Sequence, residues 1–331
     1  TGSADMGVLR SYELRFTNTT PNASLGELQE ALYRTPLIND GTENNEYEID
    51  EAGTWLITKT HGSHTKIIPD FSSEADDHIY AAIRSFEGRN LSVMVESEFT
   101  SWGNLTVTAD ASSQENSRAY GIYNCHGSEI HIKTDSNKFM IKGKEAVGVY
   151  AGNDSGDKKS LVTLSGIGNF DFDVKGGKTT GMEAGKNGEI LRADPAQNYV
   201  RDVTVNSRKG YGLYAHDGGK IELHYVSVEA PRGDALHAER GGTIYAGSIG
   251  TVSGNITTDD ASDSYIMASV KGKLEGNVRG NVDLVLLRQG IWNGKNEGVK
   301  SLVMNDGSLW NAADIETSTF GELKGDNGII R

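Results

Sequence analysis

Closely spaced histidines are the first residues in the chain that could do chemistry. His61 and His64 lie in the tetrapeptide HGSH, and His78 follows in the same region. Imidazole nitrogens bind zinc, but a zinc site needs three or four ligands in a fixed geometry. The spacing fixes no third ligand and no helix carries the pair, so we interpret them as solvated loop histidines. Cys125 is the only cysteine, which excludes an internal disulfide and a cysteine-based zinc site.

Ser155 could be a nucleophile, because the stretch NDSGD resembles the GDSG motif of trypsin-like proteases. The residue is, however, predicted to lie in a polar turn between short strands at 149–151 and 161–164. A protease would also need a double-barrel domain of about 200 residues ahead of the repeats described below. Too few residues precede those repeats, so we do not expect Ser155 to be catalytic.

Asp171 and Asp173 lie in the stretch DFDVK together with Lys175. Pectate lyases, which are β-helical enzymes, hold Ca²⁺ with carboxylates and use a Lys or Arg base. If the intervening apolar residues face inward, both carboxylates line one outer face of a strand. The ordinary exterior of an acidic protein has the same pattern, and no partner carboxylate can be assigned. An enzyme of this type is therefore an alternative and not the expected function.

Arg232, Gly233 and Asp234 spell the tripeptide that integrins recognise. Aligned with the repeats, the tripeptide falls on a corner that reads SRKGY elsewhere, and Asp234 takes the first strand position. Integrin ligands usually present this tripeptide on a protruding loop, whereas here it is expected to be tied to the body of the protein. Arg232 and Asp234 are nevertheless kept as candidate ligand-binding residues.

The elements that must position these residues are copies of one phrase, G-[IVLM]-x-A or a close variant. YGIYNCHGSEIHI (120–132) and YGLYAHDGGKIEL (211–223) are two copies, and the copies start at positions 121, 148, 181, 212 and 235, between 23 and 33 residues apart. Within a copy the apolar residues alternate with a period of two, and helical spacing is missing. Three short strands and three turns fit into one copy. Self-similarity of this length is typical of solenoids.

The repeats therefore predict an all-β parallel β-helix with three strands in each coil, in which successive coils pair strand on strand. A β-sandwich would also show short alternating strands, but it gives no reason for the recurring phrase. Near the N-terminus, Ser24 and Glu27 form a capping-box pattern ahead of Leu28, Leu32 and Pro36, which predicts a short helix. Residues 1–75 are expected to form a partly helical, partly irregular cap, and residues 76–290 to form the coils.

The period of two also predicts one outward-facing row in the first strand of successive copies. Its members are Tyr123, Tyr150, Glu183, Tyr214, His237 and Met267. Aromatic rings beside carboxylates suit sugar or protein surfaces. Stacked tyrosines can also simply stabilise the exterior of a parallel sheet, which is the simpler interpretation. If the chain binds a partner, we expect this row to be the site, with Tyr150 and Tyr214 the most reachable of its rings.

The C-terminal stretch departs from the repeat and carries its own pattern. Its marked positions are Trp292, Gly294, Leu302, Gly307, Trp310, Phe320, Leu323, Gly325 and Gly328. This order resembles the last coils of pertactin-like autotransporter passenger domains, over residues 291–331, and the weaker repeat extends the resemblance over most of residues 75–331. The resemblance implies a right-handed parallel β-helix at the bacterial cell surface, anchored through an outer-membrane barrel outside this sequence. Such passengers are most often adhesins or aggregation factors, and sometimes proteases or esterases.

The net charge and the composition limit the classes of partner that the chain could bind. The net charge of −14 makes nucleic acid and anionic membranes poor partners for the molecule as a whole. No apolar run is long enough for a membrane helix, so we expect no direct membrane insertion of this fragment. We expect an adhesin with no catalytic activity, cofactor or metal, whose partner is a host glycan, an extracellular-matrix protein or a copy of itself on a neighbouring cell. The alternatives are a carbohydrate-active β-helix enzyme and a structural stalk that presents another domain.

Overall fold

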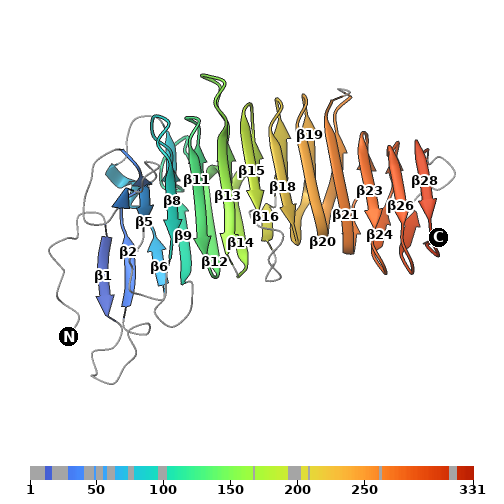
Figure 1. The fold of residues 1–331 in the computed structure, drawn as a ribbon, viewed down its shortest axis with the longest axis horizontal. Coiled ribbons are helices and arrows are strands. Elements are labelled where there is room, and N and C mark those ends of the chain that lie inside the picture. Colours follow the sequence, from blue (N-terminus) through green and yellow to red (C-terminus); the bar gives the residue numbers. More distant parts are fainter. Residues whose placement is uncertain are drawn as a thin grey trace.

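The computed structural model describes residues 12–16, 29–40, 48–49, 55–57, 64–73, 78–95, 103–166, 168–192, 203–207, 209–260, 263–312 and 319–331. This part of the chain is all-β, with one 3-10 helix, η2 (Phe71–Ser73), beside many strands. The strands follow one another in sequence order along the long axis of the molecule (Figure 1). They belong to one large, mostly parallel sheet.

The parallel pairings fall into three series, and the chain visits each series once before it returns to the first. The first series contains β7 (Ile79–Arg84), β10 (Arg118–Asn124), the ends of β12 (Asn137–Ala151) and β14 (Phe170–Ala184), β17 (Tyr211–His216) and the end of β19 (Val226–Glu239). The second contains β8 (Leu91–Met94), β11 (Glu129–Thr134), β13 (Ser160–Gly166), β15 (Gly188–Arg192), β18 (Lys220–His224) and the start of β20 (Thr243–Thr258). The third contains β9 (Asn104–Asp110), the starts of β12, β14 and β19, and β16 (Val203–Ser207). We call one passage of the chain through the three series a coil, and this order is compatible with a β-helix.

The sequence prediction of a helix beginning at Ser24 is wrong where the structure describes the segment. Residues 24–28 lie outside the described residues, but Gln29–Tyr33 forms strand β2. This strand pairs antiparallel with β1 (Tyr12–Phe16) and parallel with β6 (His64–Ile67), and Leu32 and Tyr33 are buried. Strand pairing on both sides and burial outweigh a local capping signal and helix propensity.

Other short strands near the N-terminus join the same series. Strand β3 (Leu37–Ile38) pairs with β7, and β5 (Trp55–Ile57) pairs with β8, while β4 (Glu48–Ile49) pairs antiparallel with β5. Strand β6 pairs with β9 of the third series. The described parts of residues 1–75 therefore extend all three series toward the N-terminus.

The core lies between the three series and is filled by the inward half of each alternating strand. In β17, Leu213 and Ala215 are fully buried whereas Tyr214 is only half-buried. The recurring glycine of the repeat has a packing cause. A Cβ added to Gly181 would overlap the Val205 side chain and lie 2.5 Å from the carbonyl oxygen of Gly212 in the next coil. Only glycine fits where the backbones approach so closely.

Strands β21 (Tyr265–Glu275) to β29 (Ile329–Ile330) continue the parallel pairing to the C-terminus. They include β22 (Val278–Arg279), β23 (Val282–Leu286), β24 (Ile291–Gly294), β25 (Asn296–Glu297), β26 (Ser301–Met304), β27 (Leu309–Ala312) and β28 (Glu322–Gly325). Trp292 and Trp310 pair in register, are fully buried, and stack with ring centroids 4.6 Å apart. The two indoles donate to the carbonyls of Gly276 and Gly294. The tryptophans thus form part of the core of the last coils.

Candidate functional site

The structure brings five of the predicted site residues into one row, which we call the outer ladder. Tyr123 pairs with Tyr150, Tyr150 with Glu183, Glu183 with Tyr214, and Tyr214 with His237. All five come from the first-series strands, where the period of two turns every second side chain outward. Four of them are half-buried and His237 is buried. The tyrosines are therefore less reachable than the sequence predicts.

Met267 does not continue the outer ladder, and the sequence prediction for that position is wrong. The residue paired with His237 is Thr257, in the second half of β20. Met267 pairs instead with Tyr245 and Asp283 in the second series. Strand β20 passes through all three series as one continuous strand, so the apolar phrase that follows it lies in the second series and not in the first.

The rings at the N-terminal end of the outer ladder cover one another. Tyr123 and Tyr150 stack at 5.3 Å with an interplanar angle of 21°, and Tyr120 packs against both. The Arg84 guanidinium lies 5.9 Å from the centroid of the Tyr123 ring. The stacked faces of these rings are covered by neighbours, so this end of the ladder presents mainly ring edges. An open aromatic platform, on which a sugar ring could stack, is not formed here.

A second aromatic cluster lies further along the outer ladder. Tyr211 and Tyr214 stack at 4.4 Å, Tyr214 and His216 at 4.6 Å, and Tyr211 and His237 at 5.0 Å. Neither Tyr211 nor His216 was singled out from the sequence as a site residue. Their part in the cluster depends on stacking between residues of neighbouring coils. The sequence of a single copy does not show that stacking.

A network of charged side chains joins this cluster across three coils. His216 lies with Nε2 3.0 Å from Glu183 and Nδ1 2.6 Å from Asp217. Arg240 donates to both carboxylate oxygens of Asp217, at 2.8 and 3.0 Å, and to Glu239 at 2.7 Å. Such charge-assisted, bidentate hydrogen bonds are among the stronger side-chain contacts. The network fixes the side chains around Glu183.

Glu239 connects this network to the outer ladder. This carboxylate accepts a hydrogen bond from the Tyr214 hydroxyl and lies 3.1 Å from His237 Nε2. The other ring nitrogen of His237 lies 2.6 Å from the Thr257 hydroxyl. Both ring nitrogens of His237 are therefore engaged within the protein, which leaves this residue little capacity to bind a partner.

The pKa values follow from burial and from these contacts. Burial alone would lower the pKa of His216, but hydrogen bonds to Glu183 and Asp217 raise it above its ordinary value. The hydrogen bond from Arg240 is the main cause that lowers the pKa of Asp217 to about 2. Burial, with the nearby Glu183 carboxylate, raises the pKa of Tyr150, and burial with Glu239 raises that of Tyr214. Both phenols stay protonated and can donate hydrogen bonds.

The integrin-type tripeptide lies inside strand β19 and not on a protruding loop. A Cβ on Gly233 would overlap the carbonyl oxygen of Gly210 in the preceding coil, so the backbone is held tightly. Arg232 is exposed, while Asp234 is half-buried, with its carboxylate 3.6 Å from His237 Nδ1. Asp234 is thus adjacent to the outer ladder.

The residues with other possible chemistry are not assembled into a reactive site. Ser155 donates to the Asn153 side chain, 2.9 Å away, and His64 lies 2.8 Å from the Thr106 hydroxyl, while His61 lies outside the described residues. Asp171 and Asp173 pair in register with Lys138 and Met140 on one side and with Thr204 and Asn206 on the other. In the described part of the chain, no three His, Cys, Asp or Glu side chains could together hold a metal ion.

A further aromatic surface, not expected from the sequence, lies on the second series. Tyr245 and Tyr265 pack edge to face at 5.9 Å, and Met267 beside them is 38% exposed. Lysine ammonium groups lie over both rings, and the Tyr265 hydroxyl donates to Asp283 at 2.5 Å. The alternating pattern in SYIMASV predicts that Tyr265 and Met267 share a face, but Met267 was assigned to the outer ladder instead.

Comparison with protein-family models, with curated proteins and with solved structures finds no match to this chain. No helix in the described ranges is long and apolar enough to cross a membrane. The functional interpretation therefore rests on the residues and on their geometry.

The His216 contacts predict a pH-dependent contribution to stability. A pKa that is raised in the folded state stabilises the protein below the unfolded-state pKa, and this contribution is lost as the pH rises through the folded-state pKa. We expect His216→Gln to lower the free energy of unfolding by about 1 kcal/mol more near pH 5.5 than near pH 8. Urea unfolding at the two pH values measures the difference. His224→Gln, at a histidine 3.7 Å from a single carboxylate, is the control. An equal loss of unfolding free energy at both pH values would show that His216 contributes through packing alone.

Proposed function

We propose that the chain is the passenger domain of a bacterial autotransporter and that it acts as an adhesin at the cell surface. The three series of parallel strands and the in-register tryptophans support a right-handed, three-stranded parallel β-helix of the pertactin-like type. The proposed anchor is an outer-membrane barrel. A rigid rod with fixed side chains on its exterior suits adhesion, because little conformational entropy is lost when a partner binds.

The observation that carries this proposal is the Tyr150 hydroxyl in the middle of the outer ladder. The Tyr150 ring is held between Tyr123 and Glu183 by pairing and stacking. Within the described residues, its hydroxyl makes no hydrogen bond to another protein group, whereas the Tyr214 hydroxyl donates to Glu239. Tyr150 therefore offers a fixed, protonated hydrogen-bond donor beside a carboxylate.

This chemistry favours a glycan as the partner. Sugar hydroxyl groups can accept from a phenol and donate to a carboxylate such as Glu183. The ladder side chains are already ordered by their neighbours, which reduces the entropic cost of such contacts. The covered ring faces favour recognition by hydrogen bonds at the ring edges. An extracellular-matrix protein or a second copy of the chain would use the same donors.

A glycan and matrix-protein array, read together with the aggregation of cells that display the chain, tests the proposal. We expect binding that Tyr150→Phe weakens by about tenfold, because the variant keeps the stack and removes the hydroxyl. Tyr225→Phe, at a tyrosine that is 37% exposed on a corner away from the ladder, is the matched control and should bind normally. Stability should change by no more than about 0.5 kcal/mol in either variant.

Other outcomes of the same experiment would contradict the proposal. Loss of binding in Arg232→Ala and Asp234→Ala, with Tyr150→Phe unaffected, would assign recognition to the tripeptide. No binding and no aggregation by the unmodified chain would favour a structural stalk. A lyase-type enzyme would need further carboxylates near Asp171 and Asp173, and the in-register neighbours are lysine, methionine, threonine and asparagine.

A further inference from the structure

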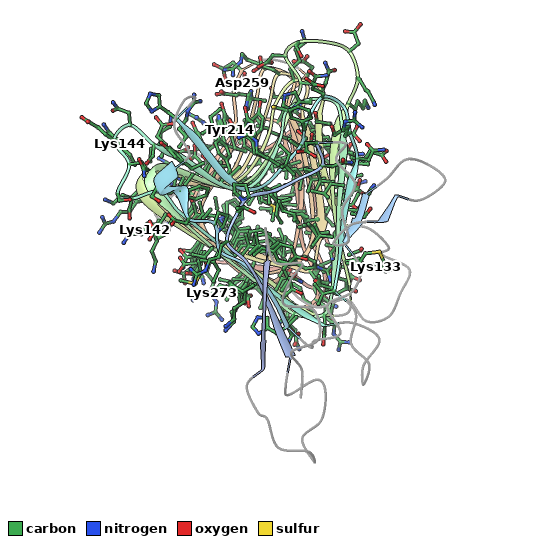
Figure 2. The ribbon with its side chains drawn as sticks, turned by 90° about the vertical axis from the view of Figure 1, so that its left-hand side faces the viewer. Lys133, Lys142, Lys144, Tyr214, Asp259 and Lys273 are labelled. Carbon is green, nitrogen blue, oxygen red and sulfur yellow. The ribbon has the colours of Figure 1, made fainter. Side chains whose placement is uncertain are left out.

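One corner of the molecule carries a row of cations that the proposed function does not use. The chain has 32 Lys and Arg against 46 Asp and Glu, so clustered positive charge is unusual for it. We call this row the basic edge; its members are all exposed and are Arg118, Lys142, Lys144, Lys178, Lys209 and Arg232. Figure 2 shows Lys142 and Lys144 projecting from one corner of the cross-section, away from the body.

Backbone contacts between coils place these cations in line. They lie where the third-series strands end and the first-series strands begin. Lys209 N donates to the Thr179 hydroxyl, which places Lys209 next to Lys178 in the preceding coil. The close approach of Gly233 to Gly210 brings Arg232 next to Lys209 in the same way. With about 4.8 Å between paired strands, the row presents roughly one cation per coil spacing.

Most cations of the basic edge form no close ion pair with the described residues of the protein. In the described residues, Lys142, Lys144, Lys178, Lys209 and Arg232 have no carboxylate oxygen within the 4.0 Å of an ion pair; Lys144 donates to the Asn116 side chain instead. Lys142 also pairs in register with Lys175. Like charges directly opposite each other in a sheet are destabilising. The pairing of Lys142 with Lys175 therefore costs stability.

Carboxylates on the same edge compensate only part of this charge. Asp110 pairs in register with Lys142 but accepts its hydrogen bonds from Ser112, and Asp173 forms an ion pair with Lys175 at 3.2 Å. Glu145 pairs in register with both Arg118 and Lys178 and so lies within the row, while Glu115 and Glu229 are exposed near it. Some cations elsewhere in the described residues are paired, as Arg240 is with Asp217 and Glu239. The basic edge is thus a line of cations, about one per coil, with Glu145 within it and few close ion pairs.

We infer that the basic edge binds a linear sulfated polysaccharide that lies along the long axis of the molecule. A single extended polymer can follow a line one side chain wide, and its sulfate groups can meet successive ammonium and guanidinium groups. A nucleic acid duplex is wider and would bring its phosphates against the flanking carboxylates. The inference rests on the proposed function in treating the chain as an extracellular binding module, but it uses a surface separate from the outer ladder.

Heparin affinity chromatography and equilibrium binding to heparin test the inference. We expect the triple variant Lys142→Gln, Lys178→Gln, Lys209→Gln to bind heparin at least about tenfold more weakly and with a shallower salt dependence. The matched control is Lys158→Gln, Lys186→Gln, Lys271→Gln, which removes three exposed cations away from the row. The control should bind within about twofold of the unmodified chain.

The possible results separate this inference from the proposed function. Tyr150→Phe should retain heparin binding, because Tyr150 belongs to the outer ladder. Failure of the unmodified chain to bind heparin would overturn the inference and leave the array result for the outer ladder untouched. An equal loss of heparin affinity in the two triple variants would contradict the inference, because it would show that only the overall charge matters. Tighter binding of duplex DNA than of heparin would indicate that the ligand is a nucleic acid and not a polysaccharide.

Discussion

Replacing Gly181 by alanine is expected to lower the free energy of unfolding by about 3 kcal/mol, at the upper end of the cost of overpacking a core. The added Cβ would overlap the Val205 side chain and lie 2.5 Å from the carbonyl oxygen of Gly212. A side chain can rotate away, but this carbonyl belongs to the next coil. Pairing of Thr180 with Tyr211 and of Met182 with Leu213 holds it in place.

Urea unfolding followed by far-UV circular dichroism measures the effect. Gly156→Ala is the matched control, because the nearest atom to its added Cβ, on Asn153, lies at 3.8 Å, which is ordinary van der Waals contact. This variant should change stability by no more than about 0.5 kcal/mol. Identical midpoints for Gly181→Ala and the unmodified chain would contradict the close stacking of first-series strands on which the proposed β-helix depends.

Trp310→Ala is expected to cost about 4 kcal/mol, the usual range for deleting a large buried aromatic side chain. The indole is fully buried and stacks on Trp292 at an interplanar angle of 9°. Phe320 packs edge-on against it at 5.5 Å, and its ring nitrogen donates to Gly294 at 3.0 Å. Truncation removes all three contacts and leaves a cavity between neighbouring coils.

Limited proteolysis is the measurement for this variant, together with thermal unfolding. Cleavage should begin within residues 290–331 in Trp310→Ala and should leave that region intact for longer in the unmodified chain. Leu323→Ala is the control, since Leu323 is 49% exposed and contributes little burial. If both variants are cleaved at the same rate as the unmodified chain, the tryptophan pair does not stabilise the C-terminal coils.

The outer ladder could be predicted because every copy of the repeat obeys one local rule. Two inward residues that stand two positions apart fix the residue between them as outward, as Leu213 and Ala215 do for Tyr214. Since parallel strands pair in register, the outward residue of one copy lies beside that of the next. The row from Tyr123 to His237 follows from this rule alone.

The features that could not be predicted depend on contacts between coils, which the sequence of one copy of the repeat does not encode. The helix expected after Ser24 was inferred from a capping signal, but β2 gains hydrogen bonds from two neighbouring strands. Met267 was misplaced because β20 passes through all three series as one continuous strand, so the next apolar phrase falls in the second series. The contact of His216 with Glu183 joins two different coils, and no local pattern predicts the rotamers that form it.

The corner after β12 has a consequence for how such chains can diverge. Eight residues, Gly152–Lys159, separate β12 from β13, whereas three, Gly185–Asn187, separate β14 from β15 one coil later. Even so, Ala151 pairs with Ala184 and Ser160 pairs with Gly188. The longer corner is absorbed outside the sheet, with Asn153 and Asn187 side chains donating to backbone carbonyls within it. Insertions and deletions at corners therefore leave the register of the body unchanged, so a lineage can remodel its loops freely while the scaffold and its surface rows are inherited intact.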